Sequence, residues 1–426
     1  MSGSRLKKSV NNIFAGVINR VLLLVFNFIF RTVMIKTLGV EYLGINGTFA
    51  DIMSMVCMAD LGFNTAVVYS FYEPLAQNDK KAIQALTTFY KKVYNTIAIV
   101  VALIGVSLIP FLNKIINLEQ NVPHLTLYYV LALADTIGSY LFAYKISVMT
   151  ADQKEYIQVR ISMVFNVVKV LLQIVLLIWL KSYGIYLVLS LIATVGSNIV
   201  ASIKAEKEYP YIKEKRGLEK EKKRDIFDTI RSVFLYKISN VILTGTDNTL
   251  ISALVGTVYV GYYSNYFLLE NSLYVIMKIV FRSTTASVGN LVVTEDAKTR
   301  YRVFDYMQTI SFCMCAVVIP CYFVLVDDFI SHVWLGKGFG IGLFALIGLC
   351  FNFYIIVQCI KNVFLVTGIS WLCYIIGTHI LVSGIIGWIL KGCLCGSLSL
   401  IITICAYRKT EGFQWLVGQA KKGLNM

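Results

Sequence analysis

Charged residues are scarce in this chain. They make up 15% of its 426 residues, whereas soluble domains carry about a quarter. Long polar stretches are scarce too, because apolar stretches of about 18 to 25 residues recur along nearly the whole length, each long enough to cross a bilayer core of roughly 30 Å as a helix. The mean hydropathy of +0.70 also indicates a chain rich in membrane-spanning segments. The composition excludes a soluble globular protein.

Alternating segments of about ten residues, which are typical of membrane β-strands, are also lacking. We therefore predict an all-α polytopic membrane protein with about twelve transmembrane helices. The predicted spans are 12–35, 43–71, 93–112, 124–148, 157–180, 185–203, 228–254, 258–286, 303–326, 341–366, 370–389 and 392–407.

Motifs for metals, cofactors and nucleotides are missing. The sequence has no CxxC pair, no cluster of Cys and His with zinc spacing and no phosphate-binding loop, and its three histidines are scattered. We predict no metal site, no cofactor and no ATP hydrolysis. The ten cysteines lie almost entirely in the C-terminal half, within predicted spans, and are interpreted as packing residues.

Basic residues gather in alternate loops, which by the positive-inside rule places both termini in the cytoplasm. The basic N-terminus is predicted as part of a retained first span, because no small-residue cleavage site follows it. The longest hydrophilic segment, 204–225, has mixed charge. It is predicted to be a cytoplasmic linker that contacts lipid headgroups and not nucleic acid. It separates an N-terminal lobe, 1–203, from a C-terminal lobe, 226–426.

A short repeat supports two lobes. The stretch LGVEYLG, with Gly39 and Gly44, aligns with VGTVYVG, with Gly256 and Gly261. Both lie where the first and second spans of a half are joined. We predict pseudo-symmetric six-helix lobes, related by an axis along the membrane normal, around a central cavity.

Polar residues follow one face of three predicted spans, at helical spacing. Charges in spans are costly and normally face a cavity, so these stripes predict a mostly cationic cavity suited to phosphate or diphosphate. Alternatively, Arg31 and Arg282 extend from span ends to headgroups. The predicted substrate-binding residues are Arg20, Asn27, Arg31, Lys237, Asn265, Lys278 and Arg282.

Acidic residues within spans are candidates for coupling or gating. Asp247 can bind a coupling proton or sodium ion, or it can form a structural ion pair with Lys237. The same coupling role is predicted for Asp60, Asp135 and Glu270.

Several stretches together resemble a known family. RTVMIKTLGVEYLGINGTFADI, ADLGFNTAVVYSFYEPLA, TDNTLISALVGTVYVGYYSNY and SVGNL resemble the Wzx-type polysaccharide repeat-unit flippases of the MOP exporter superfamily. The resemblance runs from about residue 5 to 366. In it, the arginine of the family pattern corresponds to Arg31, its aspartate to Asp247 and its asparagines to Asn265 and Asn290.

The resemblance implies a non-enzymatic exporter in the bacterial plasma membrane. Its substrate would be an undecaprenyl-diphosphate-linked oligosaccharide for capsule or exopolysaccharide, moved by alternating access. Its partners would be the polysaccharide polymerase and glycosyltransferases of the pathway. The chain departs from the family after residue 366, where the C-terminal lobe is shortened.

Three alternatives stay open. A multidrug exporter of the same superfamily should favour an acidic cavity. A membrane glycosyltransferase or polymerase needs acidic residues on an external loop, where Asp327 and Asp328 are the only candidates. A non-transporting scaffold is compatible with the shortened C-terminal lobe.

Overall fold

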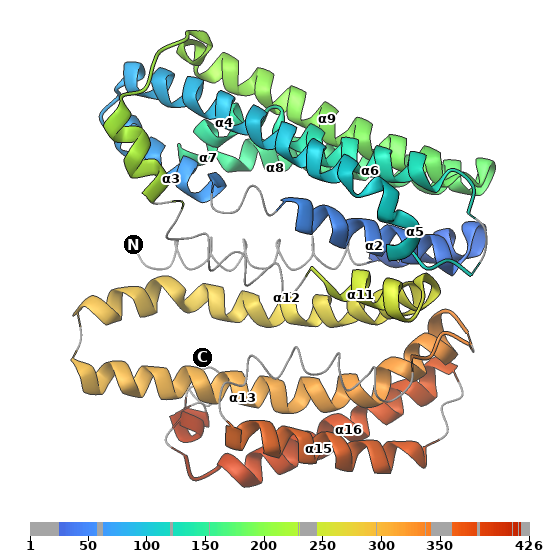
Figure 1. Ribbon diagram of the computed structural model, residues 1–426. Helices are drawn as coiled ribbons and strands as arrows, with labels where there is room; N and C mark the ends of the chain where they lie inside the picture. Colours follow the sequence, from blue (N-terminus) through green and yellow to red (C-terminus); the bar gives the residue numbers. More distant parts are fainter. Residues whose placement is uncertain are drawn as a thin grey trace. The chain divides into compact units, whose positions relative to one another are not determined.

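The computed structural model in Figure 1 describes residues 25–57, 63–119, 122–152, 154–228, 230, 245–294, 296–336, 338–341, 360–380, 384–410, 412–415 and 417–418. This part of the chain consists of helices joined by turns and short connections, and it contains no strand. The prediction of an all-α polytopic protein is confirmed.

Contacts between residues divide the chain into two compact units, Met1–Gly261 and Tyr262–Met426. The boundary falls inside α12 (Thr257–Thr294), whereas the sequence analysis divided the chain at the linker 204–225. The division into lobes 1–203 and 226–426 therefore remains a prediction.

The N-terminal unit is built around α9. This helix packs against α6 and α8, and α6 in turn packs against α4; these helices are drawn in blue to green in Figure 1. The described elements are the helix over 25–38, α2 (Val40–Val56), α3 (Phe63–Ala76), α4 (Lys80–Ser107), η2 (Ile109–Phe111), α5 (Leu112–Ile115), α6 (Leu125–Tyr140), α7 (Ala143–Ala151), α8 (Glu155–Leu180), α9 (Tyr183–Glu208), η3 (Pro210–Lys213), the helix over 220–228, and α11 (Asp247–Leu254).

The C-terminal unit is built around α13 (Ala297–Asp328), drawn in orange in Figure 1. This helix continues through Pro320 and ends in a π-helical turn, η4 (Phe329–Trp334). It packs against α15 (Ile360–Thr378) and α16 (Gly384–Tyr407). The core between them contains Phe312 and Cys315.

Within the described residues, five helical segments are long and apolar enough to cross a membrane, and the bent pair α6–α7 would make a sixth. They agree with the predicted spans 93–112, 124–148, 157–180, 185–203, 303–326 and 392–407. The segments are Lys80–Ile115, Glu155–Leu180, Tyr183–Glu208, Ala297–Trp334 and Gly384–Tyr407.

The predicted span 370–389 is wrong. α15 ends at Thr378 and α16 begins at Gly384, so this stretch contains a break between two helices. Gly384 has a φ of +74°, a conformation that glycine adopts without steric cost.

The linker is docked against the N-terminal unit. α9 extends into it as far as Glu208, and Tyr209 and Ile212 after it are buried. Its side chains form ion pairs of 2.9 Å from Lys154 to Glu208 and 2.5 Å from Lys145 to Glu206. The first part of the linker is therefore a packed extension of this unit.

Candidate functional site

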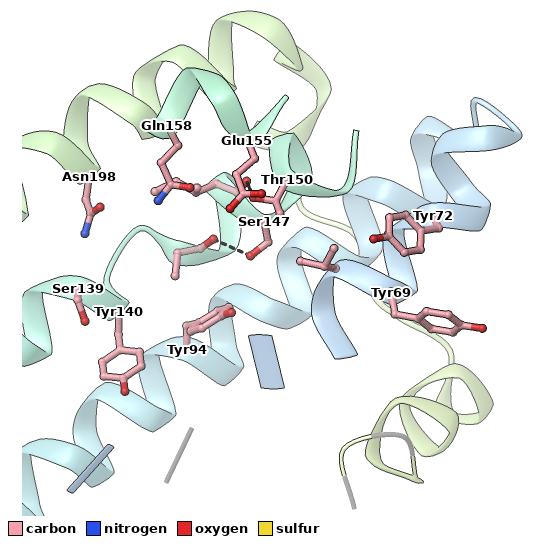
Figure 2. Close-up of a pocket in the computed structure, with 13 residues that line it drawn as sticks. Tyr69, Tyr72, Tyr94, Ser139, Tyr140, Ser147, Thr150, Glu155, Gln158 and Asn198 are labelled. Atoms are coloured by element: carbon pink, nitrogen blue, oxygen red, sulfur yellow. Dashed lines mark hydrogen bonds between the residues drawn. The ribbon is translucent and has the colours of Figure 1, made fainter. Parts of the chain in front are cut away.

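A cavity of about 680 Å³ lies within the N-terminal unit (Figure 2). It lies where the chain bends by 46° between α6 and α7. Its lining comes from α3, α4, α6, α7, α8 and α9, and consists of Val68, Tyr69, Tyr72, Tyr94, Ser139, Tyr140, Ala143, Ile146, Ser147, Thr150, Glu155, Gln158 and Asn198. We call it the tyrosine pocket.

The lining of the tyrosine pocket combines aromatic rings with neutral hydrogen-bonding groups. Four of its residues are tyrosines, and two, Gln158 and Asn198, are amides. Glu155 is the one carboxylate, and no lysine or arginine occurs among the described lining residues. Aromatic rings offer apolar surface with a polar tip, while amides both donate and accept hydrogen bonds. Such a lining suits a ligand that has apolar faces and many hydroxyl groups.

A row of polar side chains leads from the pocket along α9, at the four-residue spacing of one helical face: Tyr186, Ser190, Thr194 and Asn198. On α6, Ser139 of the pocket lies one turn from Asp135. Asp135 forms a hydrogen bond with Thr194 and faces the charge of Lys169 on α8. Its Oδ1 is buried without a hydrogen-bond partner in the part of the chain that the structure describes. The carboxylate of Asp135 therefore lies one turn from the pocket, within the electrostatic influence of Lys169.

Tyr186, at the end of this row farthest from the pocket, lies close to Arg31. Tyr186 stacks on Phe30 at 5.3 Å between ring centroids, hydrogen-bonds Asn46 and lies close to the charges of Arg31 and Asp135. The Tyr183 hydroxyl also donates to Oδ1 of Asn46 at 3.3 Å. Two predicted site residues, Arg31 and Asp135, therefore lie around the same tyrosine.

Asp247 lies elsewhere in the unit, as the first residue of α11. Next to it, Asp51 of α2 accepts hydrogen bonds from the backbone N–H of Asn248 at 2.8 Å and from its Nδ2 at 2.9 Å. Asp51 thereby stabilises the N-terminus of α11, where free N–H groups need an acceptor. The predicted pairing of Asp247 with Lys237 stays a prediction, because Lys237 lies outside the described residues.

Three further predicted residues have side chains that the structure describes. Asn27 is exposed on its helix, while Asn265 and Glu270 are buried in α12 of the C-terminal unit. Lys278 and Arg282 are helical residues whose side chains lie outside the described part. Arg20 and Asp60 are also outside it.

Asp327 and Asp328, the only acidic candidates for an enzyme, are engaged in contacts within the C-terminal unit. Asp327 accepts a hydrogen bond from the Tyr266 hydroxyl. Asp328 lies 2.5 Å from Nζ of Lys391 and 3.7 Å from Nδ1 of His332. These contacts tie the end of α13 to α12 and α16, which is a structural role.

Three features of the site were missed from the sequence. Lys169 is an ionisable residue within the predicted span 157–180. Ionisable residues within spans were the criterion for the other candidates, so Lys169 could have been found in the same way. Asp51 also lies in a predicted span and fits that criterion. The tyrosine pocket carries no linear motif, because its lining is spread over six helices.

Comparison with known proteins supports the fold. No protein-family model and no curated protein matches the chain. Among solved structures, the chain is similar to one described as the inward-facing conformation of a multidrug resistance MATE family transporter of the MOP superfamily. The TM-score is 0.54 at 14% identity, over 93% of this chain and 95% of that one. The chain therefore shares the overall fold of that solved structure.

Proposed function

We propose that this protein exports lipid-linked oligosaccharides across the bacterial plasma membrane by alternating access. The observation that carries the proposal is the lining of the tyrosine pocket. Sugars have C–H-rich faces that pack on aromatic rings, and hydroxyl groups that both donate and accept hydrogen bonds. Tyrosines, amides and hydroxyls supply these two kinds of contact together.

Two cations that lie along the row of polar side chains leading from the pocket suit the other end of such a substrate. A diphosphate is best held by arginine, which forms two parallel hydrogen bonds to phosphate oxygens. Arg31 lies beside Tyr186, and Lys169 faces Asp135 one turn from the pocket. In this proposal Arg20, Lys237, Lys278 and Arg282 add to the attraction, and Asn27 and Asn265 hydrogen-bond sugar or phosphate.

Transport would be coupled to a proton or sodium gradient. Asp135 is the coupling candidate whose surroundings are described most fully: it forms a hydrogen bond with Thr194, it feels the charge of Lys169, and one of its oxygens lacks a partner among the described residues. Asp247, Asp60 and Glu270 are the other candidates. Protonation of such a carboxylate changes the local charge and so biases a two-state carrier.

Export of cationic drugs is the second candidate function. The similar solved structure is described as a multidrug resistance transporter. In addition, the pocket places the carboxylate of Glu155 among four aromatic rings, and such rings attract organic cations through their faces. The two functions differ in the charge of the cargo, so a direct comparison of substrates separates them.

The test is translocation in proteoliposomes, with a fluorescent diphosphate-linked oligosaccharide and a cationic dye as parallel substrates. We expect the oligosaccharide to be translocated across the membrane and the dye to stay on the side where it was added. Replacement Gln158→Leu removes an amide from the pocket and should lower oligosaccharide translocation by about tenfold, the effect of losing roughly one hydrogen bond of 1 to 1.5 kcal/mol.

Asn166→Leu is the matched control, because Asn166 is exposed on the same helix and does not line the pocket. It should translocate as the unmodified protein does. Movement of the dye alone would replace the oligosaccharide proposal with drug export. Equal loss in both variants would show that the effect of Gln158 does not arise in the pocket.

A further inference from the structure

A second cavity, of about 480 Å³, lies between α3, the start of α4 and the segment 216–226. We call it the linker groove. Tyr69 of α3 lines both the linker groove and the tyrosine pocket, so the two cavities adjoin. The ring of Tyr69 points outward, away from Tyr94 (Figure 2). Both volumes lie in the range of small-molecule sites, about 300 to 1,000 Å³.

Contacts with α4 hold the linker beside the groove. The N–H of Arg216 donates to Oγ1 of Thr88 at 3.2 Å. Farther along, Phe227 meets Phe89 edge-on at 6.3 Å between ring centroids, and Ile226 is buried. The linker and the helix over 220–228 therefore form one wall of the groove, and α3 and α4 form the other.

Three exposed cations line the linker groove: Lys81, Arg216 and Lys222. Within the part of the chain that the structure describes, no ion pair joins any of them to a carboxylate. Their charges are therefore available to an anionic group that enters the groove.

Four carboxylates lie among these cations: Glu73, Asp79, Glu219 and Asp225. Asp79 also caps α4, where it accepts a hydrogen bond from the N–H of Ala82 at 3.0 Å. Carboxylates accept hydrogen bonds from hydroxyl groups, so the lining suits a ligand with many hydroxyls and one anionic group. A fully ionised diphosphate fits less well, because it has only acceptors and the carboxylates repel it.

The linker groove lies nearer the hydrophilic start of α4 than the tyrosine pocket does. Leu86 lines the groove and Tyr94 lines the pocket, and eight residues of helix cover about 12 Å. Since the predicted span begins at residue 93, the groove lies beyond the apolar part of α4. The lipid of a lipid-linked oligosaccharide stays in the bilayer, so the sugars farthest from the lipid are the ones that reach the groove.

We propose that the linker groove binds an acidic sugar, one with a carboxylate or phosphate substituent, at the end of the oligosaccharide farthest from the lipid. The inference rests on the proposed export of lipid-linked oligosaccharides and specifies their class. Lys81, Arg216 and Lys222 hold the anionic substituent, and the carboxylates accept hydrogen bonds from the sugar hydroxyls. The tyrosine pocket holds the neutral sugars that lie between the groove and the diphosphate.

Translocation of two matched substrates tests the groove. Diphosphate-linked oligosaccharides of equal length, ending in glucuronic acid or in glucose, are compared at limiting concentration in proteoliposomes of zwitterionic lipid. The unmodified protein should translocate the acidic one faster. Arg216→Gln should slow the acidic one by about three- to fivefold, the scale of an exposed ion pair, and leave the neutral one within about twofold. The preference should also weaken at about 1 M salt, which screens exposed charges.

Lys215→Gln is the matched control, because Lys215 is exposed on the same linker and does not line the groove. It removes the same charge and should leave both rates unchanged. Equal slowing of both substrates by Arg216→Gln would assign its effect to the diphosphate or to the fold of the linker. That result, or an unchanged preference for the acidic substrate, would overturn the proposal.

Binding of free sugars tests the groove without transport. The full-length protein in nanodiscs is titrated with a soluble oligosaccharide ending in glucuronic acid, with its neutral counterpart and with inorganic diphosphate. The acidic oligosaccharide should bind more tightly than the neutral one, and Arg216→Gln but not Lys215→Gln should remove the difference. Binding of diphosphate should be the same in all three proteins.

Three results of this titration would refute the proposal: equal binding of the two oligosaccharides, weaker binding of diphosphate by Arg216→Gln, or displacement of the acidic oligosaccharide when anionic lipid is added to the nanodiscs. The last result would assign the groove to lipid headgroups. Translocation of the dye alone would contradict the proposed function, whereas the titration would still decide whether the groove binds an acidic sugar.

Discussion

Arg31 shows how one charged side chain is accommodated within a span. Its helix places it beside Tyr186, whose ring stacks on Phe30 and whose hydroxyl bonds to Asn46. Tyr186 and Phe30 thus give the Arg31 side of this helix aromatic neighbours. A guanidinium binds phosphate oxygens through two parallel hydrogen bonds, which is the role that the proposed function gives to Arg31.

Replacement of Arg31 tests this. Arg31→Gln should lower translocation of the diphosphate-linked oligosaccharide by about 10- to 100-fold, as for the loss of charge-assisted hydrogen bonds of roughly 1.5 to 3 kcal/mol. Arg31→Lys should recover only part of the rate, because lysine lacks the paired donors. Lys36→Gln, an exposed position on the same helix, is the control. Equal rates for Arg31→Gln and the unmodified protein would exclude phosphate recognition by Arg31.

Asp152 lies between α7 and α8 and accepts bonds from Lys154 at 2.9 Å and from the Tyr209 hydroxyl at 2.5 Å. Burial acts to raise the pKa of Asp152, but the hydrogen bonds from Lys154 and Tyr209 and the charge of Lys154 outweigh it and lower the pKa below 3.8. The folded state therefore favours the carboxylate. Its contribution to stability is present above pH 3.8 and is lost as the pH falls through the lower folded value.

The pH dependence can be measured by thermal unfolding in detergent at pH 7 and pH 3. We expect Asp152→Asn to lower the unfolding temperature at pH 7 and to differ less from the unmodified protein at pH 3. Because the carboxylate is 35% exposed, the effect at pH 7 should be at most about 1 kcal/mol. Glu221→Gln, an exposed position of the docked linker, is the control. An equal difference at both pH values would argue against the ionised pair.

At the residue scale, the sequence predicted candidate side chains but not the residues that lie beside them. Asp135 and Arg31 were found because ionisable residues in spans stand out against apolar sequence. Their approach to Tyr186 depends on the packing of α9 against α6 and on the contact of Tyr186 with Phe30, which no local pattern encodes. The tyrosine pocket was missed for the same reason.

At the scale of helices, hydropathy predicted where spans occur better than where they end. The spans 157–180 and 185–203 lie within α8 and α9. The break between Thr378 and Gly384 was missed, because the residues on both sides are equally apolar and no charge marks the helix ends. Only the glycine hints at the break, and glycine is also frequent inside membrane helices.

The ion pair between α13 and α16 is the main electrostatic link described in the C-terminal unit. Lys391 is 6% exposed and lies 2.5 Å from Asp328. Removal of one partner leaves a buried charge, so Asp328→Leu alone should destabilise the protein by about 3 to 5 kcal/mol. Asp328→Leu combined with Lys391→Met should restore most of this, because a buried pair can be replaced by apolar residues at little cost.

Thermal unfolding of four proteins measures this coupling: the unmodified protein, Asp328→Leu, Lys391→Met and the double variant. His332→Gln is the control, since its imidazole is 3.7 Å from Asp328 and 37% exposed, and its effect should be small. Additive effects of the Asp328 and Lys391 replacements would mean that the pair does not act as a unit.

At the scale of the whole molecule, the likeness to a solved structure at 14% identity shows a shared fold, and a fold by itself identifies neither an activity nor a cargo. The sequence predicted this fold through its spans, its central linker and its short repeat. It could not predict that residues up to Gly261 cluster with the N-terminal unit, because that grouping arises from the close approach of Gly44 to Thr257 and from the Asp51 bonds.

Coupling to an ion gradient is a property of the whole molecule, because binding at one site must bias the equilibrium between two global states. Asp247 begins α11, close to the charge of Asp51, and a proton or sodium ion there would relieve the repulsion between the two carboxylates. Asp247→Asn removes that response without a change in size. We expect the variant to translocate substrate at a rate that no longer depends on an imposed pH or sodium gradient.

The measurement compares the unmodified protein and Asp247→Asn in proteoliposomes at two imposed gradients, with Asp135→Asn in parallel. A gradient-independent rate in Asp247→Asn alone would assign coupling to the start of α11, where Asn248 donates hydrogen bonds to Asp51 of α2. The same result in Asp135→Asn alone would move coupling to the pair with Lys169, beside the tyrosine pocket. If both variants respond to the gradient as the unmodified protein does, both carboxylates are structural, because neither binds the ion that drives transport.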